Sequence, residues 1–380
     1  MSDPDKINNL QKRKIRVLIA PLDWGLGHAT RCLPIIYELL RKGCEVCVAC
    51  NERQAHLMRT EVPDVQIMPL PGYNFRYSKL GALNKLATIF QVPKILIAIK
   101  REHRWLRDLL KKESFDLIIS DNRYGFYNQT AYSVFITHQL QIQVPGNKWL
   151  QRILQKWNYY FINRFNECWI PDFKVEPSLA GELSHPEVLP KIVVRYIGLL
   201  SRFENIVVST RKPVDILILI SGPEPQRTIL EEKIVDQLQK IKRSAIVVRG
   251  LPEMKDVRES FNNISFFNHL PAKELNELMS NAQVVISRSG YSTVMDIIKL
   301  GKKSILVPTP GQTEQEYLAA YLMQKKWCLS FPQNKFFIES ALQEAAQFDY
   351  TFIARDEKIH LENILGEVID RLRNQRGDEQ

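Results

Sequence analysis

The segment from Ser287 to Leu322 constrains the fold of this chain more than any other. It follows the apolar, β-branched run VVIS, which is typical of a buried parallel strand. A Ser-Gly turn then leads into a helix that Ser289 or Ser292 is expected to cap, and the strand SILVP and the polar segment GQTEQE lead into a second helix. A helix that begins at the carboxyl end of a strand presents free N–H groups to a phosphate. This order of elements predicts an α/β site for a nucleotide that carries a sugar.

A second Gly-rich turn lies far upstream, where APLDWGLGHATR overlaps and follows the apolar strand IRVLIA. Gly25 and Gly27 allow a ligand to approach the backbone, and His28 can take a proton from a hydroxyl near neutral pH. Asp121 ends the run FDLIISD, a strand that we expect beside the first one, and its carboxylate can hold the imidazole in the useful tautomer. A helix cap or sheet-end packing for His28 and a turn role for Asp121 are the alternatives.

These two segments together resemble the GT-B glycosyltransferases. The resemblance is closest to family 28, which includes the transferase that adds N-acetylglucosamine to peptidoglycan lipid I. The matching residues are Gly25, Gly27, His28, Ser289, Gly290, Asp296 where the family usually has Glu, Val307, Pro308, Gln315 and Glu316. Glu316 stands where the family often has a second Gln, which is a difference at a position expected to contact the donor sugar.

The resemblance implies an α/β GT-B fold, with two Rossmann-like parallel-sheet domains that face an interdomain cleft. It also implies an inverting, metal-independent sugar transfer from a nucleotide diphosphate sugar, with a UDP-sugar as the first choice, and no cofactor. The acceptor is a hydroxyl whose proton His28 removes, with Asp121 behind it. The expected donor contacts are Ser289 and Gly290 for the diphosphate, Asp296 for the ribose, Gln315 and Glu316 for the sugar, and Gly222, Arg227 and Arg288 for the leaving group. The acceptor side is expected to include Gly25, Gly27, His138 and Gln139.

Several of these residues have simpler interpretations. The loop SGPEPQRT, which holds Gly222 and Arg227, is also compatible with a plain turn between a strand and a helix. Its two prolines remove N–H donors, so it offers a phosphate fewer amides than a Gly-rich loop would. Arg288 can be a solvated charge, and His138 and Gln139 can be polar residues at the end of the strand SVFITH.

The 380 residues suggest two ordinary domains. We expect an acceptor-binding domain at 1–200, a linker at 201–213 and a nucleotide-sugar-binding domain at 214–380. The last helix carries an apolar stripe that can return it to the first domain, formed by Leu361, Ile364, Leu365, Val368, Ile369 and Leu372. In the first domain, Pro93 is expected to begin a helix that runs to about Lys111.

The net charge of +10 lies entirely in the N-terminal half. Of the 52 basic and 42 acidic residues, 28 and 18 fall within residues 1–195, which leaves 24 of each in the rest. The bias is strongest at 76–112, where Lys100, Arg101, Arg104 and Arg107 lie beside an apolar helical stripe. This pattern predicts a surface that attracts anionic lipid, extended by the aromatic and basic helix of residues 148–165. A core helix with a solvated basic face is the plainer interpretation.

The remaining composition points to a cytoplasmic protein that is peripheral to the inner face of the membrane. The first residues have no apolar signal segment, and no run of apolar residues is long enough to cross a bilayer. The six cysteines are expected to be reduced. Cys44, Cys47 and Cys50 have a spacing that can suit a metal, but the alternating strand CEVCVAC would place consecutive cysteines on opposite faces, so no metal site is expected.

Two other functions remain open from the sequence. A nucleotide-sugar hydrolase or 2-epimerase of the same fold would keep the donor site and lack the acceptor site, and it would release free sugar without an acceptor. A nucleic-acid-binding protein would use the basic face, with binding that depends steeply on salt. No RNA-reading motif accompanies that face, so we expect no nucleic-acid partner.

Overall fold

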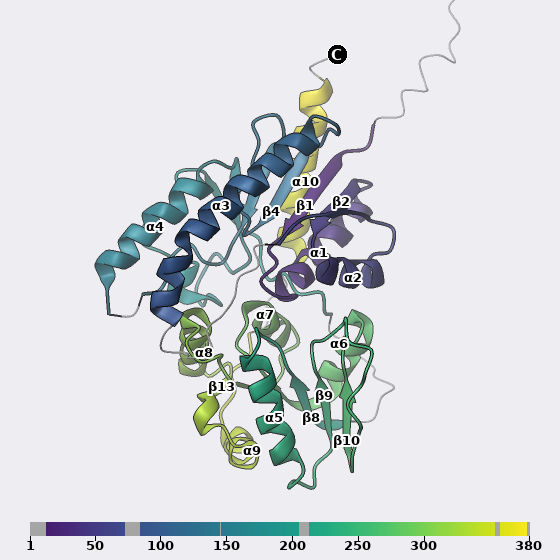
Figure 1. Cartoon of the computed structure of the whole chain (residues 1–380), viewed down its shortest axis with the longest axis vertical. Coiled ribbons are helices and arrows are strands. Elements are labelled where there is room, and N and C mark those ends of the chain that lie inside the picture. The colour runs from purple at the N-terminus through teal and green to yellow at the C-terminus, as the bar shows by residue number, and fades with distance from the viewer. Residues whose placement is uncertain (1–12, 73–83, 145, 205–212, 354–357, 378–380) are drawn as a thin grey trace, which may run out of the picture.

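The computed structural model describes residues 13–72, 84–144, 146–204, 213–353 and 358–377. Within these ranges the chain forms two α/β domains, which lie one above the other in Figure 1. Each domain is built on one sheet, and all the pairings between named strands are parallel. The expected fold class of two Rossmann-like parallel-sheet domains is confirmed.

The first sheet has the strand order β3-β2-β1-β4-β5-β6-β7. Its strands are β1 (Arg16–Pro21), β2 (Glu45–Cys50), β3 (Gln66–Pro69), β4 (Leu117–Asp121), β5 (Tyr132–Ile136), β6 (Glu167–Ile170) and β7 (Val193–Tyr196). The central strand β1 is buried on both faces: Val17 and Ile19 join one hydrophobic cluster, and Leu18 and Ala20 join another. An apolar, β-branched strand is suited to this position, because helices cover a parallel sheet on both sides.

The second sheet has the strand order β10-β9-β8-β11-β12-β13. Its strands are β8 (Val214–Leu219), β9 (Ala245–Val248), β10 (Ile264–Phe267), β11 (Ala282–Ser287), β12 (Ser304–Leu306) and β13 (Leu329–Ser330). In both sheets the chain reverses its direction of winding beside the first strand, so β1 lies between β2 and β4, and β8 between β9 and β11. Ligands of open parallel sheets bind at this switch point, outside the carboxyl ends of the strands.

Ten α-helices accompany the strands within the described residues, eight of them before the last strand. They are α1 (Gly27–Arg41), α2 (Glu52–Glu61), α3 (Asn84–Leu110), α4 (Lys148–Ile162), α5 (Gln226–Leu238), α6 (Ala272–Asn281), α7 (Tyr291–Lys299), α8 (Thr313–Gln324), α9 (Ile338–Gln347) and α10 (Lys358–Gly377). The expected start of α3 at Pro93 is wrong, because the preceding segment NKLATIFQV contains neither Gly nor another Pro and continues the helix upstream. The expected cap of α7 is also wrong: Gly290 is the N-cap residue, and no side chain caps the helix.

The two domains meet through side chains of α7 and α8 that bond to the backbone of the first domain. Ser292 Oγ donates to Gly27 O at 2.8 Å, and Tyr291 Oη donates to Pro171 O at 2.6 Å. Further along, Tyr317 Oη accepts from Glu182 N at 2.9 Å. The start of α7 therefore faces the start of α1. Most of the expected linker, residues 205–212, lies outside the described residues.

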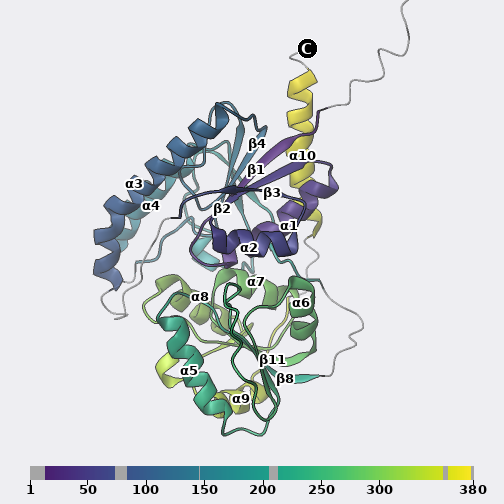
Figure 2. The same cartoon turned by 45° about the vertical axis from the view of Figure 1, so that its right-hand side comes forward.

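Helix α10 follows the second domain in sequence and packs against α1 of the first. Figures 1 and 2 both show it beside β1 in the upper domain. Arg195 of β7 pairs with Glu367 at 2.6 Å, and Arg373 donates to Lys42 O at 3.3 Å. The buried side chains of the helix are Leu361, Leu365, Val368, Ile369 and Leu372. Neither α10 nor another helix in the described ranges is both long and apolar enough to span a bilayer.

We predict that Leu365→Ala lowers the free energy of unfolding by about 2–5 kcal/mol, because it leaves a cavity where a fully buried side chain stood. Ile364→Ala, one residue earlier and only partly buried, is the matched control and should cost clearly less. Urea denaturation of both variants measures the difference. A loss for Leu365→Ala that is no larger than the loss for Ile364→Ala would contradict the full burial of Leu365.

Candidate active site

The candidate site begins with a pair of side chains at the switch point of the first sheet. Asp121 is the last residue of β4, where it is paired with Pro21 at the end of β1. His28 is the second residue of α1, after a turn in which Gly25 has a φ of +99°. His28 Nδ1 lies 3.0 Å from Asp121 Oδ2. The expected adjacency of the two strands is confirmed, and it brings these two residues into contact.

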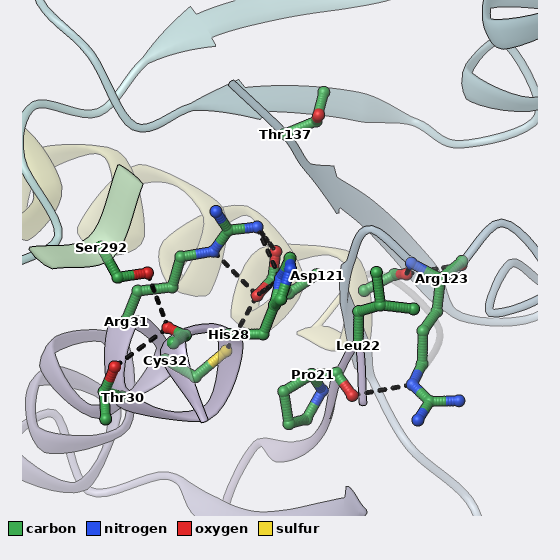
Figure 3. Close-up of polar contacts among 12 residues, drawn as sticks. Pro21, Leu22, His28, Thr30, Arg31, Cys32, Asp121, Arg123, Thr137 and Ser292 are labelled. Atoms are coloured by element: carbon green, nitrogen blue, oxygen red, sulfur yellow. Dashed lines mark hydrogen bonds and ion pairs between the residues drawn. The ribbon is translucent and has the colours of Figure 1, made fainter. Parts of the chain in front are cut away.

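Arg31 contacts both members of this pair. It was not among the site residues predicted from the sequence. Its Nε donates to Asp121 Oδ2 at 2.9 Å, and one terminal nitrogen contacts the other carboxylate oxygen of Asp121. That same nitrogen lies 2.9 Å from His28 Nδ1 (Figure 3). Arg31 follows His28 by three residues in GLGHATR, a spacing that places both on one helical face. This spacing is the sequence feature that could have identified Arg31 as a site residue.

The surroundings set the charges of this cluster. Burial alone would raise the pKa of Asp121, but the charge of Arg31 and the contacts with His28 hold it at about 2. Burial, and then the positive charge of Arg31, lower the pKa of His28 below its usual value, against an upward pull from Asp121. At neutral pH the cluster therefore contains an ionised Asp121 and a neutral His28. Among the described residues no hydrogen bond occupies His28 Nε2.

His138 extends the cluster to the second domain. It lies beyond β5, which ends at Ile136 and not at His138 as expected, although Thr137 N still bonds to Trp169 O of β6. Its Nδ1 is 3.3 Å from Arg31, and its Nε2 is 2.8 Å from a carboxylate oxygen of Glu314 on α8. Its ring stacks on Tyr291 of α7 with centroids 3.9 Å apart. Glu314 and Tyr291 were not singled out from the sequence, although both adjoin residues that were.

Gln139 follows this contact and is held by its backbone. Its N–H bonds to Thr137 Oγ1 at 3.0 Å, and its carbonyl accepts from the buried Asn158 at 2.9 Å. The backbone therefore fixes the turn in which Gln139 lies.

The second switch point lies at the start of α7, across the domain interface. Gly290 has an extended backbone there, and a Cβ added to it would meet nothing within 4 Å. Ser289 Oγ donates to Gln315 O at 2.8 Å, which ties this turn to the first turn of α8. A turn without side-chain obstruction, followed by free N–H groups of a helix, is suited to a phosphate.

Arg288 lies directly behind this turn and is 1% exposed. Its terminal nitrogens donate to the carbonyls of Val307, Pro308 and Gln226 at 3.1, 3.2 and 2.7 Å. Burial lowers its pKa to about 10, so it still carries a positive charge at neutral pH. No carboxylate in the described part of the chain pairs with it, and its Nε has no hydrogen-bond partner there. A solvated surface charge, the simpler interpretation, is wrong for this residue.

The loop before α5 and the first turn of α8 lie near the turn of Ser289 and Gly290 that precedes α7. Gly222 has a φ of +107°, which favours glycine, and a Cβ there would lie 3.6 Å from Thr309 Oγ1. Gln315 Oε1 accepts from Thr309 N at 2.9 Å, so the amide NH₂ of Gln315 remains available as a donor. Glu316 is more exposed, and its carboxylate accepts from Gly311 N at 2.9 Å.

Arg227 is placed differently from the expectation. It pairs with Glu224 at 2.6 Å and with Glu231 at 2.5 Å, and Arg249 joins Glu231 at 2.7 Å. The two glutamates compensate its charge: Glu224 lies just before α5, and Glu231 lies one turn after Arg227 on the same helical face. Arg227 is therefore omitted from the donor site proposed below.

Asp296 lies on α7, one to two turns after Gly290. Its Oδ1 accepts from Ser201 Oγ at 2.6 Å. Burial raises its pKa to about 6, while Arg202 and the bond with Ser201 act in the opposite direction. The carboxyl group is thus held near the segment between the two sheets and titrates close to neutral pH.

The four basic residues expected in the patch of the first domain, Lys100, Arg101, Arg104 and Arg107, all lie on the exposed face of α3. Ile97 is 57% exposed on that face. On α4, which lies beside α3 in Figures 1 and 2, Trp149, Trp157 and Tyr160 are 72, 49 and 62% exposed. We call these eight residues the basic-aromatic surface. The expected basic residues before residue 84 fall outside the described residues.

The cysteine run does not form a metal site. Cys44 and Cys50 belong to one hydrophobic cluster and Cys47 to another, on the opposite face of the first sheet. The described residues contain no group of three or more His, Cys, Asp or Glu side chains that could hold a metal ion.

A comparison with family models matches residues 226–362 to the glycosyltransferase family 28 C-terminal domain. Among curated proteins, the chain is 41% identical over 73 residues to a UDP-N-acetylglucosamine--N-acetylmuramyl-(pentapeptide) pyrophosphoryl-undecaprenol N-acetylglucosamine transferase of Methylorubrum extorquens. That match covers 19% of this chain and 18% of the relative's length. The protein of the same name from Buchnera aphidicola is 23% identical over 313 residues, which covers 77% of this chain and 78% of the relative.

Among solved structures, Arabidopsis thaliana UGT89C1 complexed with UDP-L-rhamnose has a similar fold, with a TM-score of 0.58 at 13% identity. The alignment covers 94% of each chain, so both domains share the architecture. The matched segment contains β9 to β13 of the second sheet, the start of α7 and the first turn of α8, where the second candidate site lies. Residues 226–362 therefore match a glycosyltransferase family 28 C-terminal domain, and the chain as a whole shares its two-domain fold with UGT89C1.

Proposed function

We propose that the protein transfers a sugar from a UDP-sugar to a hydroxyl acceptor with inversion at the anomeric carbon and without a metal ion. The observation that carries this proposal is the contact of 3.0 Å between His28 Nδ1 and Asp121, which leaves Nε2 as the free nitrogen. The pair stands at the domain interface, where Ser292 of α7 bonds to Gly27. The proposed base and the proposed donor site are therefore adjacent.

The reaction follows from the charges of these groups. The acceptor hydroxyl gives its proton to Nε2 of the neutral His28, while Nδ1–H donates to the ionised Asp121. The hydroxyl oxygen forms a bond to the anomeric carbon, and the bond from that carbon to the diphosphate breaks with its electron pair on UDP. Inversion follows if the hydroxyl and the diphosphate lie on opposite faces of the sugar.

The second domain supplies the charge stabilisation that the leaving diphosphate needs. The N–H groups at the start of α7 carry the positive end of the helix dipole, and the buried charge of Arg288 lies behind them. Thr309 Oγ1, a buried hydroxyl near Gly222 with no partner among the described residues, is a further donor. We propose that these groups replace a metal ion, so activity should survive EDTA.

The donor contacts are assigned to residues of α7 and of the first turn of α8. Asp296 is proposed to exchange its bond with Ser201 for bonds to the ribose hydroxyls, and the free amide of Gln315 is proposed to contact the sugar. Glu316 is proposed as a second sugar contact. UDP is favoured because the names of the curated relatives and the UGT89C1 complex specify UDP-sugars.

A lipid-linked acceptor is favoured by the basic-aromatic surface. Exposed lysines and arginines next to exposed tryptophans suit an anionic bilayer surface, where cations meet head groups and aromatic rings enter the interface. The names of the curated relatives specify an undecaprenol-linked acceptor. We therefore propose that the first domain docks on the cytoplasmic face of a membrane and takes its acceptor there.

We predict that His28→Ala lowers turnover about a hundredfold or more and leaves donor affinity nearly unchanged, because only the proton acceptor is lost. His56→Ala, at an exposed position on α2, is the matched control. Steady-state kinetics with a UDP-sugar and a lipid-linked acceptor measure turnover. Near-normal turnover in His28→Ala would reject His28 as the base, and rapid release of free sugar without acceptor would indicate a hydrolase or epimerase.

We predict that substitutions at Gln315 and Asp296 change the affinities for UDP and for the UDP-sugar differently. Gln315→Ala should weaken binding of the UDP-sugar by about 1–3 kcal/mol and hardly affect UDP, whereas Asp296→Ala should weaken both ligands, since both contain the ribose. Gln324→Ala, at the exposed far end of α8, is the control. Isothermal titration calorimetry with both ligands measures the losses. Equal losses at Gln315 for UDP and UDP-sugar would contradict the sugar contact.

We predict that the protein sediments with anionic vesicles at low salt, detaches as salt rises and binds neutral vesicles poorly, because salt screens the attraction. Changing Lys100, Arg101, Arg104 and Arg107 to Glu should abolish vesicle binding and leave UDP binding intact. The control reverses three charges on the second domain, at the exposed residues Lys240, Lys242 and Arg243. A wild-type protein that ignores anionic vesicles at low salt would point to a soluble acceptor.

A further inference from the structure

Arg31 is a buried cation at the centre of the candidate active site. It is 2% exposed, and Asp121, its carboxylate partner, is fully buried. Two of its nitrogens contact the two oxygens of Asp121, and one of these two also lies 2.9 Å from His28 Nδ1. Burying two charges is favourable only if both are paired and well bonded, so Arg31 and Asp121 depend on each other.

The position of Arg31 restricts where protons can lie on His28. Nδ1 can donate to Asp121 only when it carries a proton, and it can accept from Arg31 only when it carries none. The first state leaves a lone pair on Nε2, which is the state that a general base requires. An imidazolium at His28 would place a second positive charge 2.9 Å from the guanidinium. The geometry therefore favours a neutral His28 beside an ionised Asp121.

We propose that Arg31 is a positioning residue that holds Asp121 as an ionised acceptor and keeps His28 unprotonated until an acceptor hydroxyl reaches Nε2. This inference deepens the proposed function, and its catalytic consequence rests on it. Arg31 itself touches no reacting atom. It acts on the base through the Nδ1 contact and on Asp121 through both carboxylate oxygens.

Other charged or titratable groups also face this cluster. His138, beyond β5, lies 3.3 Å from Arg31, and Glu314 of α8 faces both through its contact of 2.8 Å with His138. Cys32 of α1 lies 3.9 Å from Asp121, and burial raises the pKa of its thiol well above the usual value, so it stays neutral. Positive charges at Arg31 and at a protonated His138 disfavour protonation of His28, whereas Asp121 and Glu314 favour it. Arg31 thus lowers the pKa of His28, whereas Asp121 raises it.

The proposal is tested by following the protonation of His28 by NMR in protein labelled with ¹⁵N-histidine, with its signal assigned through His28→Ala. Arg31→Gln should raise the titration midpoint of His28 by about one pH unit or more, since a nearby like charge is removed. In Arg31→Lys the titration midpoint of His28 should stay closer to that of the wild type, because lysine keeps the positive charge. Arg16→Gln, which removes a guanidinium from the opposite end of β1, is the matched control and should leave the midpoint unchanged.

If Arg31→Gln does not fold, the double variant Arg31→Gln/Asp121→Asn leaves neither charge unpaired, and its midpoint for His28 should lie above that of Asp121→Asn alone. Asp121→Asn, with Arg31 in place, should lower the midpoint, because the neighbouring negative charge is lost. A midpoint that does not move in Arg31→Gln, or that rises in Asp121→Asn, would overturn the proposal. If His28 is the base, the acid limb of the pH profile of kcat/KM should shift upward with the NMR midpoint in Arg31→Gln. A shifted NMR midpoint with an unshifted acid limb would instead reject His28 as the base and leave the role of Arg31 in positioning intact.

Discussion

The buried ion pair between Arg31 and Asp121 is the interaction on which the candidate site depends. Asp121 reaches its position because β4 pairs with β1, and Arg31 reaches it because α1 begins six residues after β1 ends. Neither charge would be tolerable alone at this depth. Their pairing fixes the carboxylate, and the carboxylate in turn orients His28. The arrangement of strands at the switch point thus places the groups that keep His28 neutral and leave its Nε2 without a partner among the described residues.

The second domain completes this arrangement from across the interface. Ser292 bonds to the first residue of α1, and Tyr291 stacks on His138, which also contacts Arg31 and Glu314. Residues from α7 and α8 are therefore linked to the proposed base through a continuous series of polar contacts. The same two helices begin beside the proposed diphosphate and sugar contacts. The proposed donor contacts and the surroundings of the proposed base consequently involve the same two helices.

Much of the fold was predictable because buried parallel strands are read directly as short apolar runs, as in IRVLIA and EVCVAC. The contact of His28 with Asp121 was also predictable, since both follow strands expected to be neighbours. The role of Arg31 was not recognised, because a polar residue on an amphipathic helix usually faces water and only the pairing of β1 with β4 buries it. The sequence did not reveal that Arg227 forms ion pairs with Glu224 and Glu231, because Glu224 lies in the loop before α5 and not on the helix. The start of α3 was predicted too late, at Pro93, because proline is common in the first turn of a helix but also occurs further inside one.

The most direct test of the account is a crystal structure of the protein with a non-hydrolysable UDP-sugar analogue. We expect the diphosphate at the N–H groups that begin α7, the ribose hydroxyls on Asp296 and the sugar beside Gln315. We also expect that His28 Nε2 faces the anomeric carbon from the side opposite the diphosphate, in contact with Asp121 through Nδ1. A nucleotide bound elsewhere, or an anomeric carbon whose face opposite the diphosphate is turned away from His28, would contradict the account.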